Sequence, residues 1–255
     1  MSARLTFVGT GEALDPALPN TSLLLEGPRS LLLDCGYAVP HAFWRVSQDP
    51  NLLDGIWISH AHADHWFGLP ALLLWMRLAG RERPLALLGG PGFGARVQAL
   101  LELGYPGSYA PHKCYPLELH ELDPGQTHSF GPLSLRVATS AHSVANYALR
   151  AEAPGMRSLM YSGDGAPTPQ TRALAQGVEV LVHECFFPTA VDGRARKHGD
   201  LPGCIELARA AGVETLALLH FAAETKSRLR ERALELASGE EFALCLPTPG
   251  ERLAL

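Results

Sequence analysis

The amino-acid sequence predicts an α/β fold of four layers, αββα, in which two mixed β-sheets pack face to face between outer helices. Short apolar runs alternate with helical patterns along all 255 residues, and both halves of the chain show a strand-then-helix order. The chain is 47% hydrophobic and has a net charge of −5, which fits a globular protein with a substantial core. No linker is long enough to divide it, so we expect a single domain over residues 1–255.

The first half of the chain begins with three short apolar strands. The letters EGPR at 26–29 are typical of a turn and predict a hairpin between the second and third strands. Pro70 in the first turn and Gly80 at the end mark the bounds of the first long helix. The predicted strands are 4–8, 22–26, 30–34, 55–59 and 85–89, and the predicted helices are 68–80 and 94–104.

The second half opens with a strand-rich stretch and then returns to alternating helices and strands. The last helix has Leu229, Ala233 and Leu236 at helical spacing, which indicates one buried face. The predicted strands are 115–122, 133–140, 146–152, 158–163, 178–184, 214–220 and 241–246, and the predicted helices are 169–177, 201–212 and 227–238.

Composition argues against several classes of protein. The N-terminal stretch lacks a signal-peptide pattern, and no run reaches the roughly 18 apolar residues that a membrane helix needs. We therefore expect a cytoplasmic protein without a membrane partner. Five scattered cysteines with no CxxC pair predict buried thiols instead of disulfides. The net acidity disfavours a general nucleic-acid binder, although basic clusters occur at 194–198 and 226–232.

The letters HAHADH at 60–65 concentrate candidate metal ligands directly after a buried-looking strand. His60 and His62 are two residues apart in an extended turn, so both side chains can face one ion. Asp64 and His65 begin the next helix and can face a second ion a few ångströms away. Imidazole and carboxylate suit zinc, manganese or iron, and the absence of a thiolate disfavours a closed structural zinc site.

Further candidate ligands follow other predicted strands, where the loops of α/β sheets converge. We expect His142 to join His60 and His62, and His220 to join Asp64 and His65. Asp164, flanked by glycines in SGDG, is the candidate bridge between the ions. Two ions about 3.5–4 Å apart can activate a bridging hydroxide and stabilise an in-line displacement at phosphorus. The sequence therefore predicts a dinuclear hydrolytic centre.

These motifs, in this order, resemble the metallo-β-lactamase superfamily over nearly the whole chain. The stretches FVGTGEA at 7–13, LLLDCG at 31–36, HADHWFGLPALL at 62–73 and VHECFF at 182–187 are similar to the ribonuclease Z-like branch. The resemblance implies that Asp34 orients a ligand histidine. It also implies that Glu184 and His198 act together in proton transfer to the leaving group, and that Asp64 orients or deprotonates the nucleophilic water.

One departure from ribonuclease Z bears on the substrate. That branch carries a long arm that binds transfer RNA between the strands matching 146–152 and 158–163, whereas here only APGMR connects them. We therefore expect a metal-dependent phosphodiesterase that acts on a small or cyclic phosphodiester. The expected cofactors are two divalent transition-metal ions, zinc first, with manganese or iron as alternatives.

Three other functions are compatible with the sequence. The nearest is a transfer RNA 3′-processing endonuclease, followed by a thioester or lactam hydrolase and then by a non-catalytic metal-binding scaffold. Asp164 disfavours a dizinc β-lactamase, which usually has cysteine there, and the pair of Glu184 and His198 disfavours a thioester hydrolase. Only three lysines are present, so nucleic acid is the less favoured partner. A homodimer is compatible with the sequence.

Overall fold

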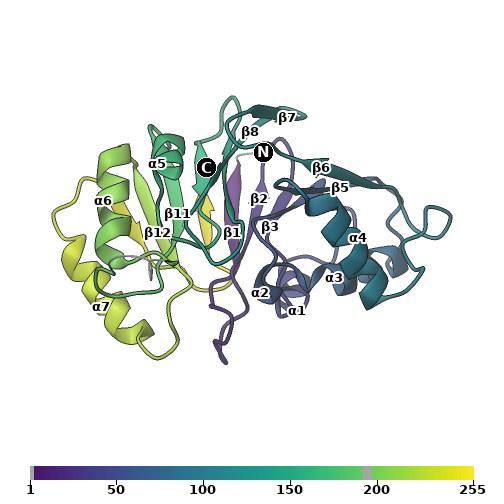
Figure 1. Ribbon diagram of the computed structural model, residues 1–255, viewed down its shortest axis with the longest axis horizontal. Coiled ribbons are helices and arrows are strands. Elements are labelled where there is room, and N and C mark those ends of the chain that lie inside the picture. Colours follow the sequence, from purple (N-terminus) through teal and green to yellow (C-terminus); the bar gives the residue numbers. More distant parts are fainter. Residues whose placement is uncertain (1–2, 192–196) are drawn as a thin grey trace.

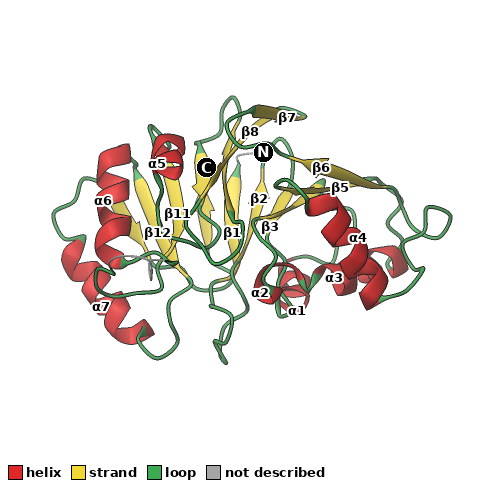
Figure 2. Ribbon diagram, in the orientation of Figure 1, coloured by secondary structure: helices red, strands yellow, loops and turns green. Residues whose placement is uncertain are grey.

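The computed structural model describes residues 3–191 and 197–255 and contains two seven-stranded mixed sheets (Figures 1 and 2). The first sheet has the order β14 (Arg252–Ala254), β1 (Arg4–Gly9), β2 (Ser22–Glu26), β3 (Leu31–Leu33), β4 (Gly55–Ile58), β5 (Leu85–Gly89) and β6 (Leu117–Glu121). The second has the order β13 (Ala243–Cys245), β12 (Thr215–Leu219), β11 (Val180–Glu184), β10 (Leu159–Tyr161), β9 (Tyr147–Glu152), β8 (Leu133–Thr139) and β7 (Thr127–Phe130).

Each sheet has a parallel part and an antiparallel part. Strands β3 to β6 are parallel to one another, and so are β10 to β13. The remaining neighbours pair antiparallel, including β2 with β3 across the predicted hairpin. The parallel strands matter most for function, because their carboxyl ends meet at one edge of a sheet and present their following loops there.

Helices cover the outer faces of both sheets, as Figure 1 shows. The helices α1 (Val39–Val46), α2 (Ala63–Trp66), α3 (Leu69–Leu78) and α4 (Phe93–Gly104) lie beside the first sheet, and α5 (Pro169–Ala175), α6 (Leu201–Ala211) and α7 (Lys226–Leu236) lie beside the second. No helix in the described part of the chain combines the length and apolar character that crossing a membrane requires.

Three buried clusters fill the spaces between these layers. Alternation along β3 sends Leu31 and Leu33 into the cluster between the sheets and Leu32 into the cluster under the helices of the first sheet. In β11, Val182 likewise faces the other sheet while Leu181 packs under the outer helices. The predicted four-layer arrangement is confirmed.

The structure also contains elements that the sequence did not predict. Helix α1 is short, and β7 and β14 are edge strands with mixed polar and apolar residues, so their patterns are weak. We expected Asp64 and His65 to begin the next helix of the chain. In the structure they lie in a separate helix of four residues, α2, which ends before α3 begins. The helix breaks before α3 because the backbone N–H of Gly68 donates to the Cys35 carbonyl, which draws the chain toward the loop after β3.

Gly36 allows that loop to approach the metal-ligand segment, which makes it a test of the fold. A Cβ at position 36 would lie 1.8 Å from the Asp64 carbonyl oxygen, whereas one at Gly27 would meet nothing nearer than 3.4 Å. We predict that Gly36→Ala lowers the free energy of unfolding in urea by about 3 kcal/mol or more, because a backbone contact cannot yield easily. The control Gly27→Ala should change it by less than about 0.5 kcal/mol. Equal stabilities of the two variants would contradict the close approach.

Candidate metal centre

The structure brings all seven predicted ligands together at one edge of the sandwich. They follow strands or begin a helix: His60 comes after β4, and His62, Asp64 and His65 lie at the start of α2. The others come from the second sheet, after β8, β10 and β12. The ligand atoms form two groups, each within 4.8 Å, that share Asp164: His60, His62, His142 and Asp164, and Asp64, His65, Asp164 and His220.

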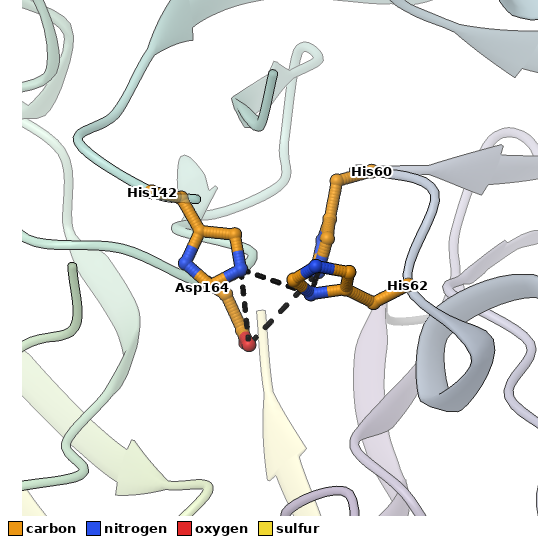
Figure 3. A group of neighbouring side chains, drawn as sticks. All are labelled: His60, His62, His142 and Asp164. Carbon is orange, nitrogen blue, oxygen red and sulfur yellow. Dashed lines mark hydrogen bonds and ion pairs between the residues drawn. The ribbon is translucent and has the colours of Figure 1, made fainter. Parts of the chain in front are cut away.

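In the first group three imidazoles and a carboxylate converge (Figure 3). His62 Nδ1 lies 3.1 Å from His60 Nε2 and 3.0 Å from His142 Nε2, while both Nε2 atoms lie 4.0 Å from Asp164 Oδ2. Nitrogens around one tetrahedral zinc ion would lie about 3.3–3.4 Å apart. Burial lowers the pKa of all three imidazoles, which favours the neutral form that binds metal.

Hydrogen bonds on the outer ring nitrogens leave the inner nitrogens of this group free to coordinate. His60 Nδ1 lies 3.0 Å from Ser59 Oγ, and His142 Nδ1 donates to the Lys197 carbonyl at 2.8 Å. The outer nitrogen of His62, Nε2, lies 3.3 Å from Ser143 Oγ. Such contacts fix ring orientation and tautomer in protein metal sites.

The second group contains buried polar atoms that lack hydrogen bonds. His65 Nε2 and Asp164 Oδ1 lie 3.3 Å apart, and neither has a hydrogen-bond partner among the described residues. Asp64 Oδ2 lies 3.2 Å from the same His65 nitrogen, and His220 Nε2 lies 3.4 Å from Asp164 Oδ2. Buried polar groups are rarely left unpaired, and a divalent cation would satisfy this set. The donors present therefore fit transition-metal ions.

Asp34, the residue after β3, holds His65 in place. Its Oδ2 accepts hydrogen bonds at 2.7 Å from His65 Nδ1, Ser59 Oγ and Tyr161 OH, and its Oδ1 accepts one from Ser59 N at 2.7 Å. Burial lowers the pKa of His65, but Asp164 and Asp34 outweigh it, so the net shift is upward. The local field therefore favours a positive charge at this imidazole, and the same field favours a metal cation.

The predicted pair of Glu184 and His198 also forms next to the ligands. Glu184 is fully buried, and its Oε1 accepts hydrogen bonds from Gly165 N and Gly199 N at 2.8 Å and from His198 Nδ1 at 3.1 Å. His198 Nδ1 is 4.0 Å from Asp164 Oδ2. Burial lowers the pKa of His198, but its hydrogen bond to Glu184 and the charge of Glu184 outweigh that effect, and the pKa is raised.

Several supporting residues were not predicted from the sequence. Ser59 and Tyr161 bind Asp34, and Asn146 Oδ1 accepts from Asp164 N at 3.2 Å. Thr21 lies 3.1 Å from His220 Nδ1. The position of Ser59 directly before His60 is the one local signal, because the other three lie in different segments from the groups that they contact.

Comparison with known proteins gives a family match over most of the chain. The family model described as "Anti-Pycsar protein Apyc1" matches residues 3–233. Curated relatives named ribonuclease BN are similar: that of Cronobacter sakazakii is 29% identical, with 90% of this chain and 92% of the relative covered. The relative from an Escherichia coli strain is 27% identical, with 85% and 88% covered.

Solved structures share the fold. The metallo-β-lactamase fold protein YhfI from Bacillus subtilis aligns with a TM-score of 0.82 at 22% identity, covering 99% of both chains. Human short-form tRNase Z aligns with a TM-score of 0.77 at 18% identity, covering 98% of both, and yeast PDE1 with 0.74 at 12%, covering 100% of this chain and 99% of that one. The expected resemblance to metallo-β-lactamase proteins with ribonuclease Z-like relatives is confirmed.

The shared carboxylate makes a specific prediction about metal content. We expect the protein purified with zinc and without chelators to hold close to two ions per chain. His60→Ala and His220→Ala should each lose about one ion, because each removes a ligand from a different group. Asp164→Ala should lose both and lower the melting temperature, because its carboxylate serves both groups. Elemental analysis by mass spectrometry measures this, and two ions retained in Asp164→Ala would show that Asp164 is not the bridge.

Proposed function

This chain belongs to the family of the anti-Pycsar protein Apyc1, and we propose that it is a metal-dependent phosphodiesterase acting on small or cyclic phosphodiesters. One observation carries the proposal: two ligand groups share Asp164, and a carboxylate–imidazole pair lies 4.0 Å from that same carboxylate. A site that combines cation ligands with a proton donor suits a reaction in which a charged ester expels an alkoxide.

The two ligand groups would hold two divalent transition-metal ions. Zinc is the proposed ion, with manganese or iron as alternatives, because the donors are imidazole nitrogens and carboxylate oxygens. When bound, such ions neutralise phosphoryl charge and make water acidic enough to serve as the nucleophile near neutral pH. The buried His65 Nε2 and Asp164 Oδ1, which have no hydrogen-bond partner among the described residues, support this assignment.

Glu184 and His198 would supply the proton that the leaving group needs. Glu184 Oε1 accepts the Nδ1–H of His198, which leaves Nε2 as the nitrogen that can hold a proton for transfer. The ring of His198 is held between neighbours, with Phe186 and His142 each 4.8 Å away between ring centroids. Its side chain keeps 23% of its surface exposed, so a substrate can reach it. Asp64, a member of the second ligand group, would orient the attacking water.

Thioester and RNA substrates fit these observations less well. A thioester expels a thiolate, a good leaving group that has little need of the pair formed by Glu184 and His198. For RNA, β9 and β10 are joined only by residues 153–158. The alignment with the Cronobacter sakazakii ribonuclease BN spans 287 positions against 255 residues here, so that relative carries segments without a counterpart in this chain.

The proton-transfer role predicts a dependence on the leaving group. His198→Ala and Glu184→Gln should each lower kcat about 10²–10⁴-fold on an unactivated phosphodiester and much less on a nitrophenyl ester, because nitrophenolate leaves without a proton. The double variant should lower kcat little more than either single change does, since the pair acts as a unit. Metal content should stay unchanged. The matched control is His112→Ala, which alters an exposed histidine that belongs to neither ligand group.

Equal losses on the two esters would mean that the pair positions substrate instead of donating a proton. No loss on either ester would remove both residues from the mechanism and favour the thioesterase alternative.

Binding of RNA separates this proposal from its nearest rival. We predict weak binding of precursor transfer RNA at physiological salt, because the chain has a net charge of −5 and a short β9–β10 connection. Fluorescence anisotropy over a series of salt concentrations measures the affinity and its salt slope. Tight binding with a steep slope would favour the endonuclease. The basic cluster 194–198 would then be the first segment to mutate, although Arg194 and Arg196 lie outside the described residues.

A further inference from the structure

We infer that Thr21 is a positioning residue for the metal centre, because its hydroxyl provides the hydrogen-bond acceptor that allows His220 to coordinate an ion through Nε2. This inference rests on the proposed function to the extent that it requires the metal site. It concerns one hydroxyl at the end of the loop between β1 and β2, and it predicts an effect on one ligand group and not on the other.

Thr21 is placed to accept a proton from His220. Both residues are buried, at 1% and 2% exposure, and Thr21 Oγ1 lies 3.1 Å from His220 Nδ1. The hydroxyl hydrogen of Thr21 is directed to the Gly11 carbonyl at 3.0 Å. A hydroxyl has one hydrogen to donate, so toward His220 the Thr21 oxygen acts as an acceptor. That arrangement offers an acceptor for a proton on Nδ1, which is where the His220 proton must sit when Nε2 binds an ion.

The hydrogen bond matters most when an ion is bound. Without an ion, His220 can carry its proton on Nε2 and donate to Asp164 Oδ2, which is 3.4 Å away. With an ion on Nε2, the proton must sit on Nδ1, and a buried N–H without an acceptor is costly. Removing the Thr21 hydroxyl would therefore penalise the metal-bound state and spare the metal-free state. Thr21 thus acts on metal affinity more than on folding.

The loop that carries Thr21 is bound to the segment that follows β12 and to the start of α7. The backbone N–H of His220 donates to the Thr10 carbonyl at 3.0 Å, and Gly11 forms an isolated bridge with Phe221. These bonds hold His220 in a left-handed conformation with φ of 59°. At the outer end of the loop, Asp15 pairs with Lys226 of α7 at 2.5 Å. The loop therefore brings the Thr21 hydroxyl and the His220 ring together in a fixed geometry.

The other ligand histidines have different outer partners, so the effect should be selective. Asp34 holds His65, Ser59 holds His60, and the Lys197 carbonyl holds His142. Loss of the Thr21 hydroxyl leaves all of these contacts intact. We therefore expect weaker binding of one ion, the one held by the group that contains His220, and unchanged binding of the other.

The experiment compares two isosteric changes of buried threonines. Thr21→Val removes a hydroxyl that bonds His220, whereas the control Thr6→Val, in β1, removes a buried hydroxyl that has no hydrogen-bond partner among the described residues. Stepwise dissociation constants for zinc are measured by competition with a chromophoric chelator. Thr21→Val should bind one ion as the wild type does and the second about 10–100-fold more weakly. Thr21→Ser should keep the wild-type affinity, and Thr6→Val should leave the binding of both ions unaffected.

A second measurement does not depend on the folding of any variant. Nitrogen NMR of wild-type protein with labelled histidine should show a proton on Nδ1 of His220 once zinc is bound. Equal zinc affinities of Thr21→Val and the wild type, equal weakening of both ions, or a zinc-bound His220 without a protected Nδ1–H would each overturn the inference. A wild type that binds no zinc would overturn the proposed function and this inference with it, so the two failures are distinguishable.

Discussion

Asp164 is a carboxylate in the protein interior, 2% exposed, and its Oδ1 has no hydrogen-bond partner among the described residues. Burying such a charge is costly unless positive charge compensates it. Burial raises the pKa of Asp164, but the charges of His220 and His65 outweigh it, and the net pKa is well below its usual range. These surroundings favour the ionised carboxylate, and the two ligand groups that share it would hold the compensating cations.

The backbone is strained at the residues that serve this centre. Asp34 and His220 are the non-glycine residues with positive φ in the described part of the chain, at 62° and 59°. Left-handed backbone costs free energy for such residues and persists only where the surroundings enforce it. The conformation of Asp34 is held by three hydrogen bonds to its carboxylate in addition to that from His65. The conformation of His220 is held by the hydrogen bond from its backbone N–H to the Thr10 carbonyl. The strained residues are thus His220, a candidate ligand, and Asp34, which holds the candidate ligand His65.

The sequence predicted the metal ligands more completely than the residues that hold them in place through hydrogen bonds. The string of residues 60–65 is local, and His142, Asp164 and His220 each follow a strong apolar strand, so pattern and topology together place them. Thr21 and Tyr161 carried no such signal, because hydroxyl residues are common and their partners lie 199 and 127 positions away in the chain. Edge strand β14 was missed for a related reason, because its partner β1 lies at the other end of the chain. Strand β7 pairs with the adjacent strand β8, and it was missed because its four residues, THSF, form too weak an apolar pattern.

The central claim is that Asp164 lies between two metal ions, and anomalous X-ray scattering from crystals grown with zinc tests it most directly. Data collected above and below the zinc absorption edge should give two anomalous peaks about 3.5–4 Å apart. One should lie among His60, His62 and His142, the other among Asp64, His65 and His220, and both should contact the Asp164 carboxylate. A single fully occupied peak, or two peaks that do not share Asp164, would contradict the account.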